Sequence, residues 1–155
     1  MIALYPGSFD PPHLGHLDLI RRAAAGVSHL LVGVAVNPDK RPFLSALERI
    51  ELLSAECADL ANVAVTSYQG QTVAYARSQG ATILVRGLRN LADLEAERGL
   101  ATINREVGGL ETWFLLAASA HLHISSDLVR KALAAGMAVD RLVPPRVAAR
   151  LARLA

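Results

Sequence analysis

The sequence has a single cysteine, Cys57, among 155 residues. One cysteine cannot form an internal disulfide, so the chain suits a reducing compartment. The N-terminus lacks the basic segment and long apolar run of a signal peptide, and the uncharged stretch 112–126 is too short to cross a bilayer. We therefore expect a cytoplasmic protein that has no membrane partner.

Charge is sparse as well, because Asp, Glu, Lys and Arg make up only 19% of the residues. Sixteen basic and fourteen acidic residues leave a formal net charge of +2, which is too weak for general adhesion to nucleic acid. Lysine occurs only at Lys40 and Lys131, so the other fourteen basic residues are arginines. Arginine suits bidentate binding of phosphate groups, although a biased coding composition would produce the same excess.

Hydrophobic residues are abundant, at 52%, which excludes a disordered chain and supplies enough apolar surface for one core. We expect a single domain over residues 1–155. Apolar, β-rich runs alternate with segments of helical periodicity. The expected strands are 2–5, 29–36, 63–67, 81–87 and 111–117, and the expected helices are 15–25, 45–57, 72–79, 91–107, one between Ser126 and Gly136, and one after Pro145.

This alternation predicts an α/β fold: a single-domain, Rossmann-like, doubly wound parallel sheet of five strands with flanking helices. The apolar runs are nearly continuous, so we expect the strands to be covered on both faces. The Ala-rich segment 139–155 could form helices at a subunit interface or could equally cover the sheet of a monomer. Such sheets bind ligands at the carboxyl ends of the strands, so the loops that follow the strands are the candidates for function.

The loop after the first expected strand reads Tyr5-Pro-Gly-Ser-Phe-Asp-Pro-Pro-His-Leu-Gly-His16. Gly7 lets a ligand approach the backbone closely, and Ser8 offers a hydroxyl. His16 falls in the first turn of the next helix, where unpaired N–H groups and the helix dipole favour a phosphate. This combination indicates a phosphate site.

Two common nucleotide-binding motifs are missing: neither the Walker A pattern nor G-x-G-x-x-G occurs anywhere in the chain. P-loop nucleotide hydrolases and ordinary dinucleotide dehydrogenases are therefore disfavoured. The stretch His13-Leu14-Gly15-His16 instead resembles the H-x-G-H signature of the nucleotidyltransferase superfamily, whose members join a nucleotide to a phosphate and release pyrophosphate.

Three further loops carry suitable residues. Lys40 and Arg41 follow the second strand, where an ordinary solvated turn would explain them equally well. Arg86 and Arg89 flank Gly87 after the fourth strand, and two guanidinium groups can bind phosphates bidentately. The segment 121–127 contains two serines that can cap the following helix or bind a phosphate at its N-terminus.

Taken together, five motifs narrow the resemblance to one family. GSFDPPHLGH, NPDKRP, VRGLRNLADLEAE, GLETWFL and HISSDLVRK occur in this order between residues 7 and 131. This order resembles that of the phosphopantetheine adenylyltransferases. The resemblance implies transfer of AMP from ATP to 4′-phosphopantetheine with Mg²⁺, giving dephospho-CoA and pyrophosphate, in a homohexamer.

The resemblance also implies roles for individual residues. His16 would stabilise the transition state. The implied contacts of the acceptor substrate are Ser8, Lys40, Thr72 and Arg86. The implied contacts of ATP are Ser8, Phe9, His16, Gly87, Leu88, Arg89, Glu97, His121, Leu122, His123, Ile124, Ser125, Ser126 and Asp127.

Four positions depart from the family pattern. His13 replaces a common Thr, His121 and Ala96 stand where aromatic residues are frequent, and Asp127 adds a negative charge beside the expected triphosphate. Because His13 is more typical of nicotinate enzymes, another acceptor such as nicotinate mononucleotide is the alternative reading. A non-enzymatic ATP-binding module of the same architecture is the other, and turnover with any acceptor would exclude it.

Overall fold

Strands and helices alternate along the chain in the predicted order. The computed structural model describes residues 1–154. Its elements are β1 (Ile2–Gly7), α1 (Leu14–Ala25), β2 (His29–Ala35), α2 (Ala46–Glu56), β3 (Val63–Tyr68), α3 (Thr72–Ser78), β4 (Ile83–Leu88), α4 (Leu91–Glu106), β5 (Glu111–Leu116), the 3₁₀ turn η1 (Ser119–His121), α5 (Ser126–Ala134) and α6 (Pro145–Leu151).

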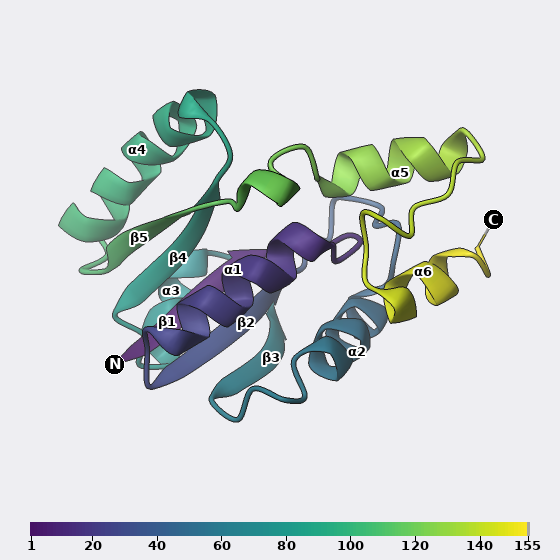
Figure 1. Cartoon of the computed structure of the whole chain (residues 1–155). Coiled ribbons are helices and arrows are strands. Elements are labelled where there is room, and N and C mark those ends of the chain that lie inside the picture. The colour runs from purple at the N-terminus through teal and green to yellow at the C-terminus, as the bar shows by residue number, and fades with distance from the viewer. Residues whose placement is uncertain (155) are drawn as a thin grey trace.

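The five strands form one parallel sheet in the order β3-β2-β1-β4-β5 (Figure 1). β1 lies at its centre, where Ala3 pairs with Leu30 of β2 on one side and with Ile83 of β4 on the other. The chain therefore winds outward twice from β1, first through β2 and β3 and then through β4 and β5. The doubly wound parallel fold predicted from the sequence is confirmed.

Helices lie on both faces of the sheet because side chains alternate along each strand. On one face, Val32 and Val85 pack with Ile20 of α1 and Leu53 of α2. On the other face, Leu4 and Leu84 pack with Ala76 of α3. Cys57 is buried in the first cluster, as a core residue would be.

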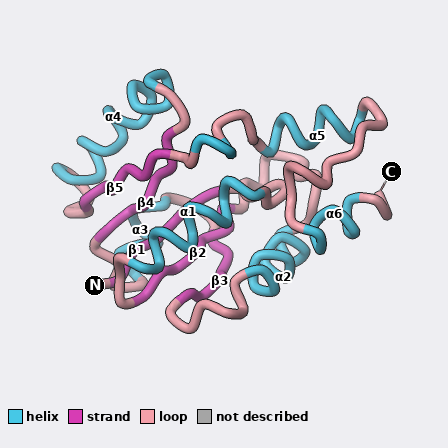
Figure 2. Tube along the Cα trace, in the orientation of Figure 1, coloured by secondary structure: helices cyan, strands magenta, loops and turns pink. Residues whose placement is uncertain are grey.

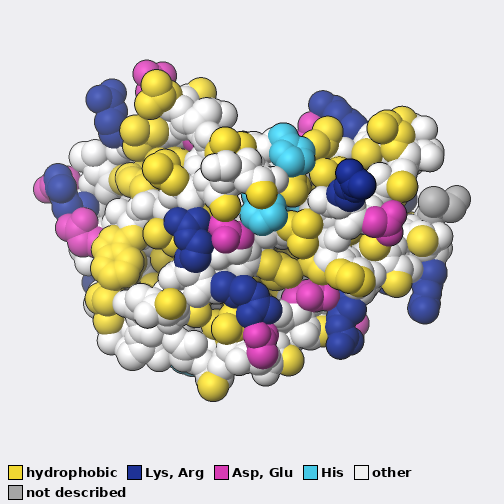
Figure 3. All heavy atoms as spheres, in the orientation of Figure 1, with side chains coloured by type: hydrophobic (Ala, Val, Ile, Leu, Met, Phe, Trp, Pro, Cys, Tyr) yellow, Lys and Arg dark blue, Asp and Glu magenta, His cyan; other side chains and the backbone are white. Residues whose placement is uncertain are grey.

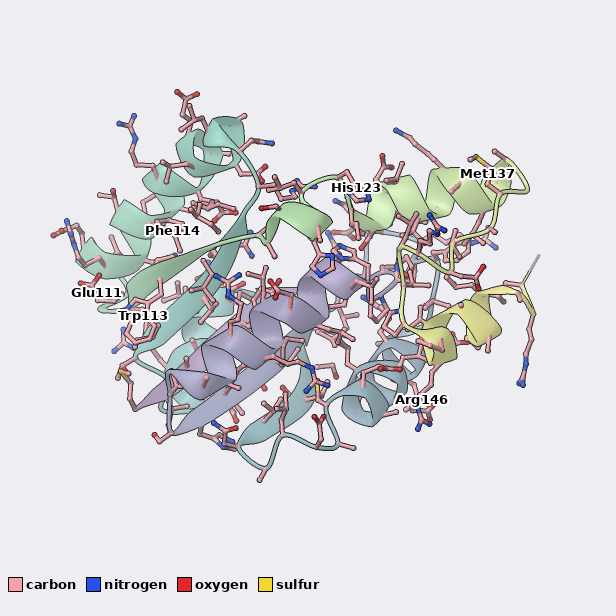
Figure 4. The ribbon with its side chains drawn as sticks, in the orientation of Figure 1. Glu111, Trp113, Phe114, His123, Met137 and Arg146 are labelled. Atoms are coloured by element: carbon pink, nitrogen blue, oxygen red, sulfur yellow. The ribbon has the colours of Figure 1, made fainter. Side chains whose placement is uncertain are left out.

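The expectation that every strand is covered on both faces is wrong for β3 and β5. These two strands form the edges of the sheet, and their residues are mostly half-buried or exposed. Figure 4 shows Trp113 and Phe114 leaving β5 on opposite sides, and both residues remain partly accessible. The adjoining helix α4 buries none of its residues.

The C-terminal segment does not cover the sheet, which was one of the two possibilities that the sequence left open. Val143, Val147 and Leu151 instead pack against Val129 of α5 and Leu44 in a separate cluster. Figure 1 shows α5 and α6 beyond one end of the sheet, with α6 next to α2. Within residues 1–154, no helix has the length and apolar character needed to span a membrane.

Candidate functional site

The strand order reverses between β1 and β4, and a cavity of about 350 Å³ lies at that reversal. Figure 2 shows the loop after β1 and the segment between β5 and α5 meeting at this end of the sheet. The loops after β1, β4 and β5 supply the walls. The lining residues are Tyr5, Pro6, Gly7, Ser8, Phe9, His13, Gly15, His16, Leu19, Arg86, Gly87, Arg89, Ala117, His121, Ile124, Ser125 and Ser126.

Phe9 shapes the floor of this cavity. Its backbone φ is +49°, a left-handed conformation that a bulky residue adopts only where its surroundings hold it. The ring is 1% exposed and meets Tyr5 edge-to-face at 5.4 Å between centroids. A Cβ on Gly7 would lie 2.9 Å from the Phe9 ring, so only glycine fits there.

His13 and His16 form a stacked pair at the start of α1, with ring centroids 3.5 Å apart. His13 is the N-cap residue, and its Nδ1 accepts from the His16 amide at 3.3 Å. His16 returns the contact, because its Nδ1 accepts from the His13 amide at 3.3 Å. The two imidazoles thus make the reciprocal hydrogen bonds that Ser and Glu make in an ordinary capping box.

Burial and neighbouring charges lower the pKa of both rings. Burial, followed by the charges of Arg89 and His121, lowers the pKa of His13 to about 4. Burial also holds the pKa of His16 well below its usual value, with His13 as the next cause. Both imidazoles are therefore neutral at pH 7. Since each Nδ1 accepts a hydrogen bond, each Nε2 carries the proton, and His16 is a neutral hydrogen-bond donor beside the cavity.

The depressed pKa of His13 predicts a loss of stability in acid. Below about pH 6.5 the unfolded chain binds a proton that folded His13 rejects, so the free energy of unfolding falls until about pH 4. The full loss is about 3 kcal/mol for the shift of His13. We expect His13→Thr, which keeps an N-cap oxygen, to weaken this pH dependence.

Urea unfolding at pH 7.0 and pH 4.5 measures the difference. The wild-type chain should lose more stability between these values than His13→Thr does, since the carboxylates titrate in both proteins. Equal losses in the two proteins would contradict a buried, neutral His13.

Arg86 and Arg89 reach the cavity from the end of β4 and its loop. Arg86 donates from Nε to Glu97 Oε2 at 3.0 Å, from Nη2 to Glu97 Oε1, and from Nη1 to the Pro6 carbonyl at 3.1 Å. Arg89 pairs with Asp93 of α4 at 3.1 Å. A guanidinium group has five N–H donors, so Arg86 keeps two for a ligand.

The N-terminus of α5 forms the third wall. Ser125 is the N-cap residue and accepts from the Leu128 amide at 3.1 Å, while Ser126 donates to the Pro11 carbonyl at 2.9 Å. The Nδ1 of His121 is buried and has no hydrogen-bond partner among residues 1–154. In Figure 3, the visible histidine side chains lie together over the N-terminal end of α1 and the loop before α5.

Several residues implied by the resemblance lie outside this cavity. Lys40 lines a neighbouring groove of about 800 Å³, which meets the cavity at Ser8. Thr72 shares a hydrogen bond with the Tyr68 hydroxyl at 2.8 Å. Of the other residues outside the cavity, Leu88 is buried and Glu97 pairs with Arg86. Three more are exposed, namely Leu122, His123 and Asp127.

Strand order explains this distribution. The loop after β2 lies beside the loop after β1 but away from β4, which places Lys40 in the adjacent groove. β3 lies one strand farther out, and Thr72 follows it at the start of α3.

The carboxylate of Asp127 pairs with Lys131 at 2.8 Å, which offsets the negative charge of Asp127 near α5.

Sequence reasoning missed two arginines near this site. Arg49 is 3% exposed and donates to the Ser8 carbonyl at 2.7 Å, and Arg130 donates to the Asp10 carbonyl. Arg49 lies inside an ordinary helical pattern that gives no sign of its burial. The sequence did contain a signal for Arg130. It lies four residues after Ser126, one turn along α5, so the two side chains share one face of that helix.

Comparisons with known proteins agree with this geometry. A family model described as cytidylyltransferase-like matches residues 4–132. A solved structure described as a putative nicotinate-nucleotide adenylyltransferase from Vibrio parahaemolyticus covers 97% of both chains with a TM-score of 0.70 at 20% identity, which supports the fold.

Curated relatives are much closer in sequence. A phosphopantetheine adenylyltransferase from Synechococcus sp. (strain JA-2-3B'a(2-13)) is 48% identical over 95% of this chain and 93% of its own. Proteins of the same name from Ruegeria pomeroyi and Symbiobacterium thermophilum are 43% and 41% identical, over 94% and 96% of this chain and 92% and 93% of theirs. The chain therefore belongs to the phosphopantetheine adenylyltransferase family of nucleotidyltransferases.

Proposed function

We propose that this enzyme transfers AMP from ATP to 4′-phosphopantetheine, giving dephospho-CoA and pyrophosphate. One observation supports this proposal most strongly. A single cavity at the reversal of strand order is lined by the neutral imidazole of His16 and by the guanidinium groups of Arg86 and Arg89. The curated relatives carry the name of this activity, which supports it for a chain of 41–48% identity.

The reaction needs charge stabilisation more than proton transfer. A phosphate oxygen of the acceptor attacks the α-phosphorus of ATP, and the bond from that phosphorus to the oxygen bridging to the β-phosphate breaks. The electron pair leaves with pyrophosphate. The second pKa of a phosphate monoester is about 6, so the nucleophile is mostly a dianion at pH 7 and needs no general base. We infer direct in-line attack without a covalent enzyme intermediate.

The chain's own residues offset the repulsion between the two anions. Arg86 and Arg89 place positive charge beside the reacting phosphates, and Lys40 adds charge from the neighbouring groove. His16 donates its Nε2–H to the α-phosphoryl oxygens as charge moves in the transition state. Ser8 lies where the two spaces meet, so it suits contact with both substrates.

We propose that Mg²⁺ enters with ATP. Mg²⁺ in such sites is usually held by substrate phosphates, waters and few carboxylates. Within residues 1–154, no group of three or more His, Cys, Asp or Glu side chains is arranged to hold a metal ion, and no carboxylate lines the cavity. This donor set fits a cation carried by the triphosphate, where it neutralises phosphate charge.

An acceptor screen tests the proposed function. Purified protein with ATP and Mg²⁺ should release pyrophosphate with 4′-phosphopantetheine and not with nicotinate mononucleotide. Turnover with nicotinate mononucleotide alone would establish the alternative acceptor, to which His13 points. ATP binding without turnover on any acceptor would instead indicate a binding module.

Because Cys57 is a buried free thiol, we place the enzyme in the reducing cytoplasm.

We also propose that the enzyme is a homohexamer. The number of subunits follows from the family resemblance, while exposed apolar residues on α4 and β5 support self-association. α4 buries no residue in the single chain, and its Leu100 and Ile103 are 55% and 57% exposed. Leu116 of the edge strand β5 is 70% exposed.

Placing charge on this surface should reduce the assembly. The double variant Leu100→Glu, Ile103→Glu should elute as a smaller species with an unchanged circular dichroism spectrum, measured by size exclusion with light scattering. Leu47→Glu is the control, because Leu47 is also exposed, at 64%, but lies on α2. A wild-type mass for the double variant would exclude α4 from the interface.

A further inference from the structure

Side-chain donors hold four backbone carbonyls, one near the end of β1 and three in the loop that follows it. The donors come from three elements that are distant in the sequence. The pairs are Arg86 with Pro6, Arg49 with Ser8, Arg130 with Asp10, and Ser126 with Pro11. The donor from β4 therefore holds the end of β1, and the donors from α2 and α5 hold the loop.

Arg49 has an unusual environment for a charged residue. It is 3% exposed, and among residues 1–154 it forms no ion pair. The carboxylate nearest in the loop, that of Asp10, accepts instead from the amides of Phe43 and Leu44 at 2.7 and 2.8 Å. A buried cation without a counter-charge is costly, so its hydrogen bonds to carbonyl oxygens are its compensation.

The loop that these donors hold has a special backbone. Phe9 adopts its left-handed conformation between Ser8 and Asp10, the two residues whose carbonyls accept from Arg49 and Arg130. Within the described chain, the amide N–H groups of Ser8 and Phe9 donate to no acceptor. Both residues line the cavity, so two unpaired donors belong to its wall.

We propose that Arg49 and Arg130 are positioning residues for phosphate binding. They hold the Ser8 and Asp10 carbonyls on the side of α2 and α5, which stabilises the left-handed Phe9 and fixes the Ser8 and Phe9 amides as donors to the phosphates of the nucleotide. Arg49 borders the groove that holds Lys40 but is only 3% exposed, and its Nη1 donates to the Ser8 carbonyl, so we assign its role to the loop. This inference rests on the proposed function, because it takes ATP as the ligand.

The test separates the phosphates from the rest of the nucleotide. NMR titration gives the Kd of ATP and of adenosine for wild type, Arg49→Met and Arg130→Met. We expect the Kd of ATP to rise about tenfold in each variant, the effect of losing one hydrogen-bonding contribution. The Kd of adenosine should stay unchanged, and Arg49→Lys should recover part of the ATP affinity.

Arg150→Met serves as the control, since Arg150 pairs with Glu48 across α6 and α2 and contacts no carbonyl of the loop. It should bind ATP as wild type does. Arg130 is accessible enough that its replacement should fold even where Arg49→Met does not, because its side chain is 37% exposed.

Two results would overturn the inference alone: an unchanged Kd for ATP in the variants, or equal weakening of ATP and adenosine, which would indicate general loosening. A wild-type protein that binds no ATP would remove the proposed nucleotide site and this inference with it. The wild-type titration therefore distinguishes failure of the function from failure of the positioning role.

Discussion

Replacing His16 with alanine should lower kcat by about 10²–10³-fold and leave the Kd for ATP nearly unchanged. A donor aimed at charge that develops in the transition state contributes about 3 kcal/mol, and its loss appears in kcat rather than in binding. His16 suits this role because its ring is fixed by the His13 stack and by edge-to-face contact with Phe9 at 4.9 Å. Pyrophosphate release at saturating substrates gives kcat, and calorimetry gives the Kd.

His16→Gln provides the control for this experiment. Glutamine at the third helical position can still accept from the His13 amide, and its amide nitrogen can still donate. This variant should keep the stability that His16→Ala loses and retain more of the rate. Near-full kcat in His16→Ala would remove the imidazole from the mechanism.

The sequence alone could not show that the His16 imidazole is neutral. The H-x-G-H spacing places His16 in the first turn of α1, and the structure confirms that position. Its pKa depends on burial and on the facing His13 ring, which are properties of the packed loop. The sequence therefore predicts where the imidazole lies, while the structure adds which nitrogen carries the proton.

Local patterns predicted most of the fold for a physical reason. The capping box Ser45–Glu48 and the left-handed glycines Gly80 and Gly136 mark helix ends through hydrogen bonds and backbone sterics within a few residues. Strand order is different, since it depends on packing between distant segments. The exposure of β5 and the separation of Lys40 from the main cavity both follow from strand order and could not be read locally.

Arg86→Met should lower kcat/KM for the acceptor by about 10²–10³-fold, because removing one partner of a hydrogen-bonded charge pair in a partly buried site costs about 2–5 kcal/mol. Glu97 orients the guanidinium group of Arg86. Its carboxylate side chain is only 18% exposed and takes two of the five N–H donors, which fixes the plane of the guanidinium group. The resemblance assigns Glu97 to the nucleotide, and in the structure its carboxylate pairs with Arg86.

The same substitution should also destabilise the fold. Without Arg86, the Glu97 carboxylate keeps its partial burial but loses its partner, at a cost of about 2 kcal/mol. Adding Glu97→Leu should restore the midpoint of urea unfolding and leave kcat/KM as low as in Arg86→Met. Measuring both quantities on the single and double variants separates the two roles. If the double variant recovered activity, the loss in Arg86→Met would come from the stranded carboxylate, and the direct contact of Arg86 with phosphate would be wrong.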